Sequence, residues 1–436
     1  MIPAEWLQYA PKPKPLIDGN EWNVFLSYRS VNRTWVLNLY DVLTELGHKV
    51  FLDQYVLKPG DKLIKNLEAA LDKTQAGILI WSKATRDSVW VNDEYEALQQ
   101  RANSDNDFIF IPVTIDDTKL PTFAASRVYI DFASYPDGPN GGDLLRLLYA
   151  LAGMSMEKEA IEFADEQNEA SRLAMAKIKA AIKNNMAARL VKLFEEGGLP
   201  WKTTAALGCM AAEGLIKLKS YDDAIAMLEK LETTFKKALR PQQLKGLALA
   251  RRGKNDDLDN AQDILGELYA RNHLDPETMG IYARTFMDRY AISNNGNDLL
   301  QARGLYAEAF EKAPDDYYTG INAAAKSVFI GTPEDLEKAN EYAAKVQNNI
   351  GVDAYPGDYW KTATVAELFL IQKNYTQAGK MYKKAIEMAL SETGSHESTF
   401  TQARRLMKML KPTTEEKLSV IDPFKNLQGY SEALAE

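Results

Sequence analysis

Short apolar runs alternate with longer helical patterns in roughly the first 150 residues, and this alternation constrains the fold more than any other feature of the chain. The apolar runs, rich in β-branched and aromatic residues, are residues 23–28, 49–53, 76–82, 108–115 and 128–132. The helical patterns between them are residues 35–46, 63–73, 92–101 and 143–151. Continuous apolar runs are typical of strands covered on both faces. Their alternation with helices predicts a parallel sheet with right-handed crossovers.

The carboxyl ends of the predicted strands are where a ligand is expected, because ligands of open parallel sheets bind at that edge. These ends are residues 27–30, 53–61 and 82–94. Residues 27–30 read SYRS, which is neither the glycine-rich loop of a dinucleotide-binding dehydrogenase nor that of a P-loop NTPase. His48 precedes the second strand, at the opposite edge, so a Ser-His-Asp triad is also disfavoured.

Four segments at these strand ends resemble the motifs of TIR domains. They are residues 25–29 (FLSYR), 51–53 with 57–61 (FLD and LKPGD), 80–82 (IWS) and 90–94 (WVNDE). The segments follow one another in the family's order, on the corresponding elements and at one edge of the sheet. The resemblance implies a TIR domain with a flavodoxin-like parallel α/β fold.

Glu94 lies in the segment that carries the catalytic glutamate of NAD-cleaving TIR domains, so the resemblance implies that it is catalytic here. Cleavage of the nicotinamide–ribose bond generates positive charge on the ribose, which a neighbouring carboxylate stabilises. NAD+ is then the substrate, and no further cofactor is expected. The alternative is that Glu94 is a solvated glutamate in the first turn of a helix, favoured there by the helix dipole.

Other residues at the same edge complete the predicted site. The candidate substrate-binding residues are Tyr28, Arg29, Asp53, Ser82 and Trp90. Arg29 could pair with the pyrophosphate of the substrate or be an ordinary surface arginine. Trp90 could line the substrate site or pack within the domain. Asp53 ends a strand and could have no role beyond capping the turn that follows. The resemblance implies that a loop helps to complete the site of a neighbouring copy, and its residues are Leu57, Lys58, Pro59, Gly60 and Asp61.

After residue 155 the strand signals stop and helical patterns continue. Residues 156–194 contain no proline, which predicts a long helix or a helix pair. A pattern of four residues then recurs at positions i, i+3, i+7 and i+10, with alanine at i+3. We call each copy of this pattern a stripe. Its copies are Tyr221, Ala224, Leu228 and Leu231; Leu258, Ala261, Leu265 and Leu268; Leu299, Ala302, Tyr306 and Ala309; Leu336, Ala339, Ala343 and Val346; Tyr375, Ala378, Tyr382 and Ala385. The spacing places each stripe on one helix face and predicts an irregular tetratricopeptide (TPR)-like array.

Part of this half resembles the central regulatory domain of apoptosis signal-regulating kinases, sometimes called a TRAF-binding domain. The segments that carry the resemblance are residues 280–290 (GIYARTFMDRY), 302–322 and 359–390. It implies a regulatory or interaction module, without a kinase. Stacked helical repeats form concave surfaces, so a protein or peptide partner is expected there.

The composition excludes several kinds of site. A net charge of −9 argues against general binding to nucleic-acid backbones. Cys209 is the single cysteine, which excludes an intramolecular disulfide and a zinc site of several thiolates. We interpret it as a buried packing thiol rather than a nucleophile. The three histidines, His48, His273 and His396, form no close pair in the sequence, so a histidine metal cluster is not expected.

The predicted architecture is multidomain, with an α/β sheet domain followed by an all-α repeat array. The predicted divisions are an N-terminal extension (1–17), the TIR domain (18–152), a helical linker (153–200), the repeat domain (201–411) and a loosely attached tail (412–436). No signal peptide is evident, and no apolar run reaches the roughly 18 residues that span a bilayer. A cytoplasmic location is therefore expected.

Three functions fit these features. The first is an NAD+ glycohydrolase that is activated by self-assembly, regulated by the repeats and used in prokaryotic immune defence. The second is a non-catalytic TIR scaffold that self-associates and recruits partners through the repeats. The third is an effector secreted into a host. Glu94 favours the enzyme, because an adaptor has no need of a carboxylate at that position.

Overall fold

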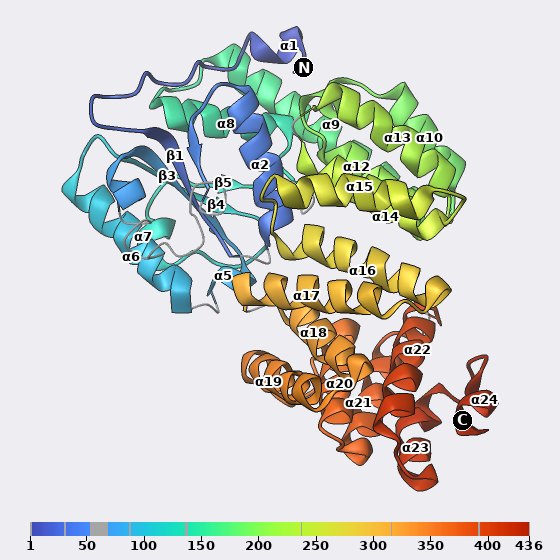
Figure 1. Ribbon diagram of the computed structural model, residues 1–436. Coiled ribbons are helices and arrows are strands. Elements are labelled where there is room, and N and C mark those ends of the chain that lie inside the picture. The colour runs from blue at the N-terminus through green and yellow to red at the C-terminus, as the bar shows by residue number, and fades with distance from the viewer. Residues whose placement is uncertain are drawn as a thin grey trace. The chain divides into compact units, whose positions relative to one another are not determined.

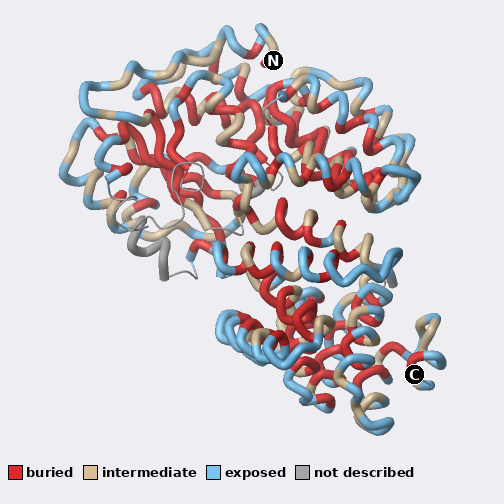
Figure 2. Tube along the Cα trace, in the orientation of Figure 1, coloured by how far each residue is buried: buried red, intermediate tan, exposed pale blue. Residues whose placement is uncertain are grey.

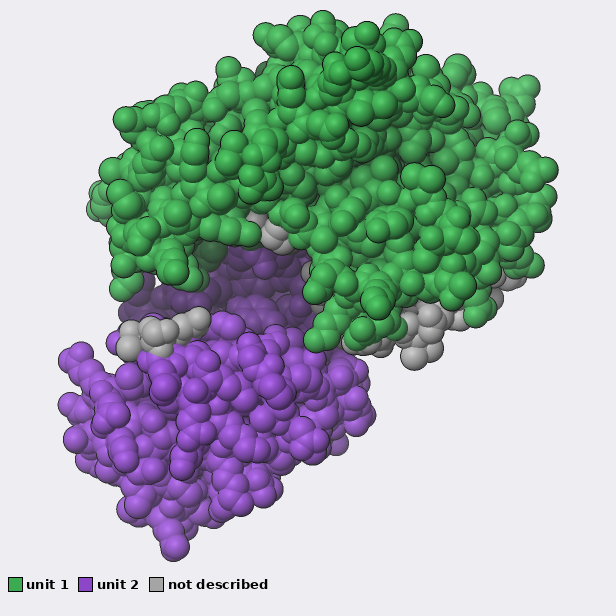
Figure 3. All heavy atoms as spheres, turned by 180° about the vertical axis from the view of Figure 1, so that it is seen from behind, with its two compact units in different colours: residues 1–273 green, residues 274–436 purple. Residues whose placement is uncertain are grey.

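The computed structural model describes residues 2–29, 32–52, 69–86, 89–135, 138–236, 238–314, 316–390 and 393–435, without the side chains of residues 34, 84, 89–94 and 393. The chain divides into two compact units, residues 1–273 and 274–436, coloured separately in Figure 3. The first unit holds the sheet and the helices up to α15, and the second is helical in its described residues (Figure 1).

Five parallel strands form one sheet in the first unit. They are β1 (Trp22–Ser27), β2 (Val50–Phe51), β3 (Thr74–Trp81), β4 (Ile109–Thr114) and β5 (Ile130–Asp131). Their order across the sheet is β2-β1-β3-β4-β5. This confirms the predicted parallel α/β fold.

The strands at the centre of the sheet match the apolar runs better than those at its edges. All eight residues of β3 are buried, as expected for a strand covered on both faces (Figure 2). The edge strands β2 and β5 are two residues each, shorter than the runs that predict them. An edge strand is paired on one side only, and Val128 at the start of the last run is 90% exposed.

Among the described residues, helices α2 (Arg33–Glu45), α5 (Lys83–Arg86), α6 (Val89–Ser104) and α7 (Thr122–Ala125) lie between strands. Helix α8 (Gly141–Ala152) follows the last strand, and a short α1 (Ala4–Leu7) precedes the first. Three of the four predicted helices correspond to α2, α6 and α8. The fourth, residues 63–73, lies largely outside the described residues.

Seven more helices follow in the described residues of the first unit. They are α9 (Lys158–Lys183), α10 (Ala187–Glu196), α11 (Leu199–Thr203), α12 (Ala206–Lys217), α13 (Tyr221–Thr234), α14 (Leu239–Arg252) and α15 (Asp257–Ala270). The segment predicted to be a long helix or a helix pair is a pair, α9 and α10. The break between them includes Asn185, whose φ of 54° is outside the right-handed helical region.

The second unit consists of helices in its described residues. They are α16 (Pro276–Ser293), α17 (Gly296–Lys312), α18 (Tyr317–Ile330), α19 (Pro333–Ile350), α20 (Tyr359–Ile371), α21 (Tyr375–Met388), α22 (Thr393–Leu410), α23 (Thr414–Ile421), the 3-10 turn η2 (Asp422–Phe424) and α24 (Tyr430–Ala435).

The recurring stripe marks the second helix of successive helix pairs. Its five copies fall on α13, α15, α17, α19 and α21, and the alanine of every copy is at most 1% exposed. The first helix of a pair can also carry a small residue where the two meet. A Cβ added at Gly246 of α14 would lie 3.0 Å from Cγ of Leu265 on α15. The predicted TPR-like stripe is therefore a packing face between paired helices.

The first part of the predicted tail, residues 413–424, is packed rather than loosely attached. Helix α23 begins with a capping box between Thr413 and Glu416. Val420, Ile421 and Phe424 are at most 1% exposed, and the Phe424 ring packs edge-on against Tyr382 of α21. Burial of these apolar side chains fixes the first half of the segment that the sequence predicts to be loose, whereas most of residues 425–435 are exposed or half-buried.

Helix α8, the last element around the sheet, packs closely against α9. A Cβ added at Gly142 would lie 2.2 Å from the Ala164 carbonyl oxygen, so glycine permits the approach. Asp143 accepts hydrogen bonds from Asn168 on α9 and from Arg146, which also pairs with Asp165. The sheet domain and the helices that follow it are thus joined by a dense interface inside the first unit.

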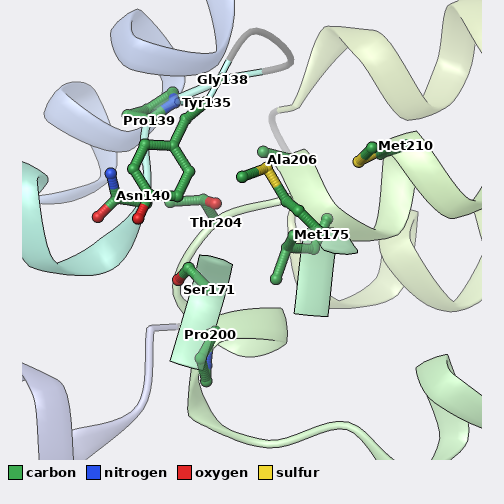
Figure 4. Close-up of a pocket in the computed structure, with 11 residues that line it drawn as sticks. Tyr135, Gly138, Pro139, Asn140, Ser171, Met175, Pro200, Thr204, Ala206 and Met210 are labelled. Atoms are coloured by element: carbon green, nitrogen blue, oxygen red, sulfur yellow. The ribbon is translucent and has the colours of Figure 1, made fainter. Parts of the chain in front are cut away.

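A small cavity lies beside this junction (Figure 4). Its lining includes Tyr135, Asn140, Ser171, Met175 and Met210, drawn from the loop before α8 and from α9 and α12. Its volume of about 10 Å³ is room for about one water molecule, so it is a packing defect rather than a substrate site.

Candidate active site

Polar side chains join the loop after β1 to the end of β3. The two strands are neighbours, with Ser27 in register with Leu79, so Tyr28 and Ser82 follow them at the same carboxyl edge. Asn32 donates a hydrogen bond from Nδ2 to Oγ of Ser82 at 2.7 Å. Two of the candidate substrate-binding residues are therefore brought to one edge of the sheet by a direct link between their loops.

Ser82 begins a turn whose polar groups are mutually bonded. Its Oγ lies 3.1 Å from Oγ1 of Thr85 and accepts a hydrogen bond from the Thr85 backbone N–H. The Thr85 hydroxyl donates to the Ile80 carbonyl oxygen at 3.0 Å. Next to Ser82, the Lys83 backbone N–H donates to Oδ2 of Asp116 at 2.8 Å, in the loop after β4. This network fixes the ends of β3 and β4 relative to each other.

The Tyr28 side chain is held by Arg33, on the first turn of α2. Arg33 donates from Nη1 to the Tyr28 hydroxyl at 2.7 Å, and its guanidinium carbon is 5.9 Å from the ring centroid. Arg33 is 9% exposed, so the pair lies in a largely desolvated position. Tyr28 is therefore pre-positioned before any ligand binds. Arg29 follows it directly and is half-buried.

Helix α6 places Glu94 at the same edge of the sheet. The helix begins at Val89, directly after the carboxyl end of β3 and α5, and Glu94 is its sixth residue. The predicted helix began at residue 92, so the start was placed three residues late. The first turn of α6 contains no acidic residue, so Glu94 lies in the second turn and not in the first. The choice between a solvated and a catalytic Glu94 concerns its side chain and stays a prediction.

Several candidate residues fall outside what the structure describes. These are Asp53, the loop residues Leu57, Lys58, Pro59, Gly60 and Asp61, and the side chains of Trp90 and Glu94. The roles predicted for them stay predictions.

Sequence reasoning missed the residues that position the site. Asn32, Arg33, Thr85 and Asp116 bond to candidate residues or to their neighbours at the strand ends. The available signal was that polar residues follow directly after apolar runs. Their partners are far away in sequence, so the pairings themselves leave no local pattern.

His48 lies at the opposite edge of the sheet, as the sequence predicts. With Asn23, Gln75 and Asp107, which precede or begin the strands, it lines a cavity of about 200 Å³. Burial lowers the pKa of His48 to about 4, so its imidazole is neutral at physiological pH. The described residues also include no group of three or more His, Cys, Asp or Glu side chains placed to hold a metal ion.

Comparison with protein families agrees with this geometry. Residues 24–147 match the family model described as "TIR domain". This part of the chain is a TIR domain. Residues 220–327 match the model described as "Tetratricopeptide Repeats-Sensor", which confirms the TPR character predicted from the stripe. The finer likeness to apoptosis signal-regulating kinases stays a prediction. No helix among the described residues is long and apolar enough to cross a membrane.

The TIR domain is similar to several curated proteins. "NAD(+) hydrolase TcpC" of Escherichia coli O6:H1 is 30% identical over 97 residues, 22% of this chain and 32% of the relative. "Probable 2' cyclic ADP-D-ribose synthase BdTIR" of Brachypodium distachyon is 30% identical over 118 residues, 26% of this chain and 50% of the relative. "3' cyclic ADP-D-ribose synthase AaTIR" of Aquimarina amphilecti is 28% identical over 116 residues, 26% of this chain and 35% of the relative. The match therefore spans a third to a half of each relative's length.

One solved structure also overlaps much of the chain. The C-terminal part of a TPR repeat-containing protein from Cytophaga hutchinsonii covers 61% of this chain, and 99% of its own, at 15% identity and a TM-score of 0.28. A likeness this slight supports no inference beyond the TIR and repeat families already named.

Proposed function

We propose that the TIR domain cleaves NAD+ at the nicotinamide–ribose bond and that Glu94 is the catalytic carboxylate. The observation that carries the proposal is the place of Glu94 on α6. Position 94 is four residues before Leu98, which is fully buried against the sheet. Residues four apart share a helix face, so position 94 lies on the sheet-facing side of α6, one turn nearer the carboxyl edge.

Close packing of α6 on the sheet supports this placement. A Cβ added at Gly77 of β3 would lie 2.3 Å from Cδ2 of Leu98, so glycine lets the helix approach the strand. The Tyr95 ring also packs against Trp81, the last residue of β3, with ring centroids 6.5 Å apart. The first turns of α6 are thereby held beside the end of the strand that Ser82 follows.

The proposed reaction needs a site that stabilises positive charge on the ribose. Nicotinamide leaves with the electron pair of the bond, and a carboxylate stabilises the oxocarbenium-like ribose. Attack by water then gives ADP-ribose and a proton. Attack by a hydroxyl of the same molecule gives a cyclic product, as the names of two relatives describe for those proteins. We propose that Tyr28 and Arg29, which are half-buried, contact the sugar and the pyrophosphate at this edge. Ser82 is 3% exposed, and its hydroxyl is bonded to Asn32 and Thr85, so its proposed role is to hold these loops together.

Replacing one carboxylate tests the proposal. Glu94→Gln should slow nicotinamide release by about a hundredfold or more, because a lost electrostatic stabiliser costs roughly 3 kcal/mol of barrier. Glu96→Gln is the matched control, since Glu96 is an exposed residue of the same helix, and it should retain activity. The assay follows nicotinamide and the ADP-ribose products chromatographically, and circular dichroism checks folding. Full turnover by folded Glu94→Gln protein excludes Glu94 from the mechanism. Failure of the unaltered protein to cleave NAD+ at any concentration favours the scaffold.

We further propose that activity requires self-assembly and that the helical repeats control it. The TIR domain lacks a glycine-rich phosphate loop of its own, so a neighbouring copy would supply residues 57–61 to close the site. Tethering TIR domains through the repeats would raise their effective concentration. Depletion of NAD+ in the cytoplasm on assembly suits immune defence in a prokaryote. Controlled expression in bacteria should lower cellular NAD+ and stop growth, and the Glu94→Gln protein should do neither.

A further inference from the structure

A cavity of about 460 Å³ lies inside the second unit, among the first helices of three pairs and α22. Its lining residues come from α16, α18, α20 and α22, together with Tyr306 of α17. Helix α22 packs against α18 and α20 (Figure 1). Ligand sites of small molecules are typically concavities of about 300–1,000 Å³, so the size alone admits one. The charged groups in its walls are what point to a ligand.

Lys326 of α18 carries a buried ammonium in the wall of this cavity. The residue is 5% exposed, and its hydrogen bond to a described residue runs from Nζ to Oδ1 of Asn322 at 2.8 Å. The remaining surroundings of Nζ include the rings of Tyr306 and Phe329, whose centroids are 5.7 and 5.4 Å away. Burial lowers the pKa of Lys326 to about 8, against the opposing effect of Glu367. An ammonium has three donors, so the described residues do not satisfy all of them.

Glu367 of α20 faces the same cavity. Its carboxylate accepts a hydrogen bond from Nε2 of Gln402 at 2.9 Å, and burial raises its pKa. The charges of Glu367 and Lys326 influence each other, yet no direct ion pair joins them within the described residues. Burying opposite charges without contact between them is costly, so a ligand group that reached both would stabilise the arrangement.

The residues that line the cavity include equal numbers of basic and acidic side chains and two exposed aromatic rings. The lining contains three basic and three acidic side chains, which are Arg284, Lys326, Arg405, Asp288, Glu367 and Glu397. Two aromatic residues at the lining are largely exposed, Tyr318 at 46% and Trp360 at 50%. A site with equal numbers of both charges does not favour a polyanion such as a nucleotide over other ligands. It suits a ligand that carries both charges and an apolar portion.

We propose that this cavity binds a small zwitterion, namely a free α-amino acid or a compound with the same pair of groups. The carboxylate of the ligand pairs with Lys326 and its ammonium pairs with Glu367, so each buried charge gains a partner. The remaining part of the ligand lies against Tyr318 and Trp360 at the mouth. The description "Tetratricopeptide Repeats-Sensor" for residues 220–327, which include Lys326, is consistent with a ligand here. Binding is independent of NAD+ cleavage.

Thermal unfolding of the full chain with each standard amino acid, one at a time, is the first test. At least one amino acid should raise the unfolding temperature, since a ligand that binds the folded state stabilises it. For that amino acid, titration calorimetry should show binding about tenfold or more weaker for its amide, which lacks the carboxylate, and for its N-acetyl derivative, which lacks the ammonium. Inorganic phosphate and a mononucleotide are the anionic probes and should bind no better than the amide.

Two variants test the residues themselves. Lys326→Met should abolish binding, and the matched control Lys345→Met, an exposed lysine of α19, should leave it unchanged. Trp360→Ala, at a position that is 50% exposed, should weaken binding several-fold and keeps the test open if Lys326→Met fails to fold. The proposal is overturned if none of the amino acids raises the unfolding temperature. It is also overturned if binding survives both Lys326→Met and Trp360→Ala. Binding of the mononucleotide alone, lost in these variants, would assign the cavity to an anion instead.

Discussion

Buried titratable side chains set how this protein responds to pH, and His48 is the clearest case. It is 7% exposed, its pKa is lowered to about 4 by burial, and the charged residues that line its cavity are Lys14 and Asp107. Between pH 6.5 and about 4 the unfolded chain binds a proton on this imidazole and the folded chain does not. The free energy of unfolding therefore falls as the pH falls through that window.

The predicted loss from His48 is about 3 kcal/mol across the window, from a pKa lowered by some two to three units. Urea unfolding at a series of pH values should show a shallower decline for His48→Gln than for the unaltered chain below pH 6.5. Above pH 7 the two curves should run parallel, which serves as the internal control. Equal slopes below pH 6.5 would show that His48 binds a proton in the folded protein as readily as in the unfolded chain, so that its pKa is not lowered by burial.

Single residues of the candidate site could be predicted only where a motif marks them. Glu94, Tyr28 and Ser82 stand in segments that resemble a family, so the sequence identifies them. Asn32 could not be predicted, because its role rests on a hydrogen bond to Ser82, which lies on another strand end. The register of α6, which puts Glu94 in its second turn, depends on where the helix starts, and helix ends predicted from sequence are uncertain by a few residues.

Elements with a strong period were predicted well, and contacts between elements were not. The stripes on α13 to α21 are local patterns of small and large residues, so they predict both the helices and their buried faces. The lengths of β2 and β5 depend on their places at the edges of the sheet, which no single run records. The packing of η2 against α21 also depends on a partner far away in the chain, so the sequence alone suggested a loose tail.

Helix α14 depends on a residue of the TIR domain for its first turn. Oδ2 of Asp41 on α2 accepts a hydrogen bond from the Leu239 backbone N–H at 3.1 Å, while the N-cap residue Ala238 provides no side-chain cap. A carboxylate at a helix N-terminus satisfies a free N–H and interacts favourably with the helix dipole. This contact couples the TIR domain to the repeat helices within the first unit.

Asp41→Ala should therefore destabilise the start of α14 by about 1 kcal/mol, the usual cost of losing a cap. Hydrogen–deuterium exchange should be faster in a peptide that covers residues 239–243, with little change in the sheet. Asp263→Ala is the control, since Asp263 is exposed on α15, and it should leave that peptide unchanged. Unaltered exchange in Asp41→Ala would mean that water replaces the cap at no cost.

At the scale of the whole molecule, each compact unit contains its own buried core. The second unit buries clusters such as Met287, Leu299 and Ala302, and Tyr359, Ala363 and Ala385, between its own helices. The sequence predicts a change at residues 153–200, where strand signals stop, whereas the compact units divide at residue 273. Helices α9 to α15 belong to the same compact unit as the TIR domain because α9 packs directly on α8.

Residues 274–436 should consequently fold alone. The isolated fragment should give a helical circular dichroism spectrum and a single cooperative thermal transition, because its apolar side chains are buried within it. It should also bind the same amino acid as the full chain. A fragment that melts gradually, or that shows a strand signal, would place the division elsewhere.

The proposed assembly predicts a dependence on concentration. NAD+ cleavage per molecule should rise steeply with protein concentration, because each site needs a neighbouring copy. Asp61→Lys should reduce activity without unfolding the chain, and mixing it with Glu94→Gln protein should restore part of the activity. Each variant then supplies the part that the other lacks. Specific activity that stays flat over roughly a hundredfold dilution of a monomeric protein would rule assembly out.

The absence of a side chain at Gly142 limits how this chain can be recombined. A Cβ there would lie 2.2 Å from the Ala164 carbonyl oxygen, so a TIR domain transplanted onto these helices must bring glycine to the corresponding place. A domain on a flexible tether could be exchanged freely by gene fusion. Here a single methyl group decides which TIR domains fit. Chimeras with alanine at this position should not form the packed junction between α8 and α9, although both parent proteins fold.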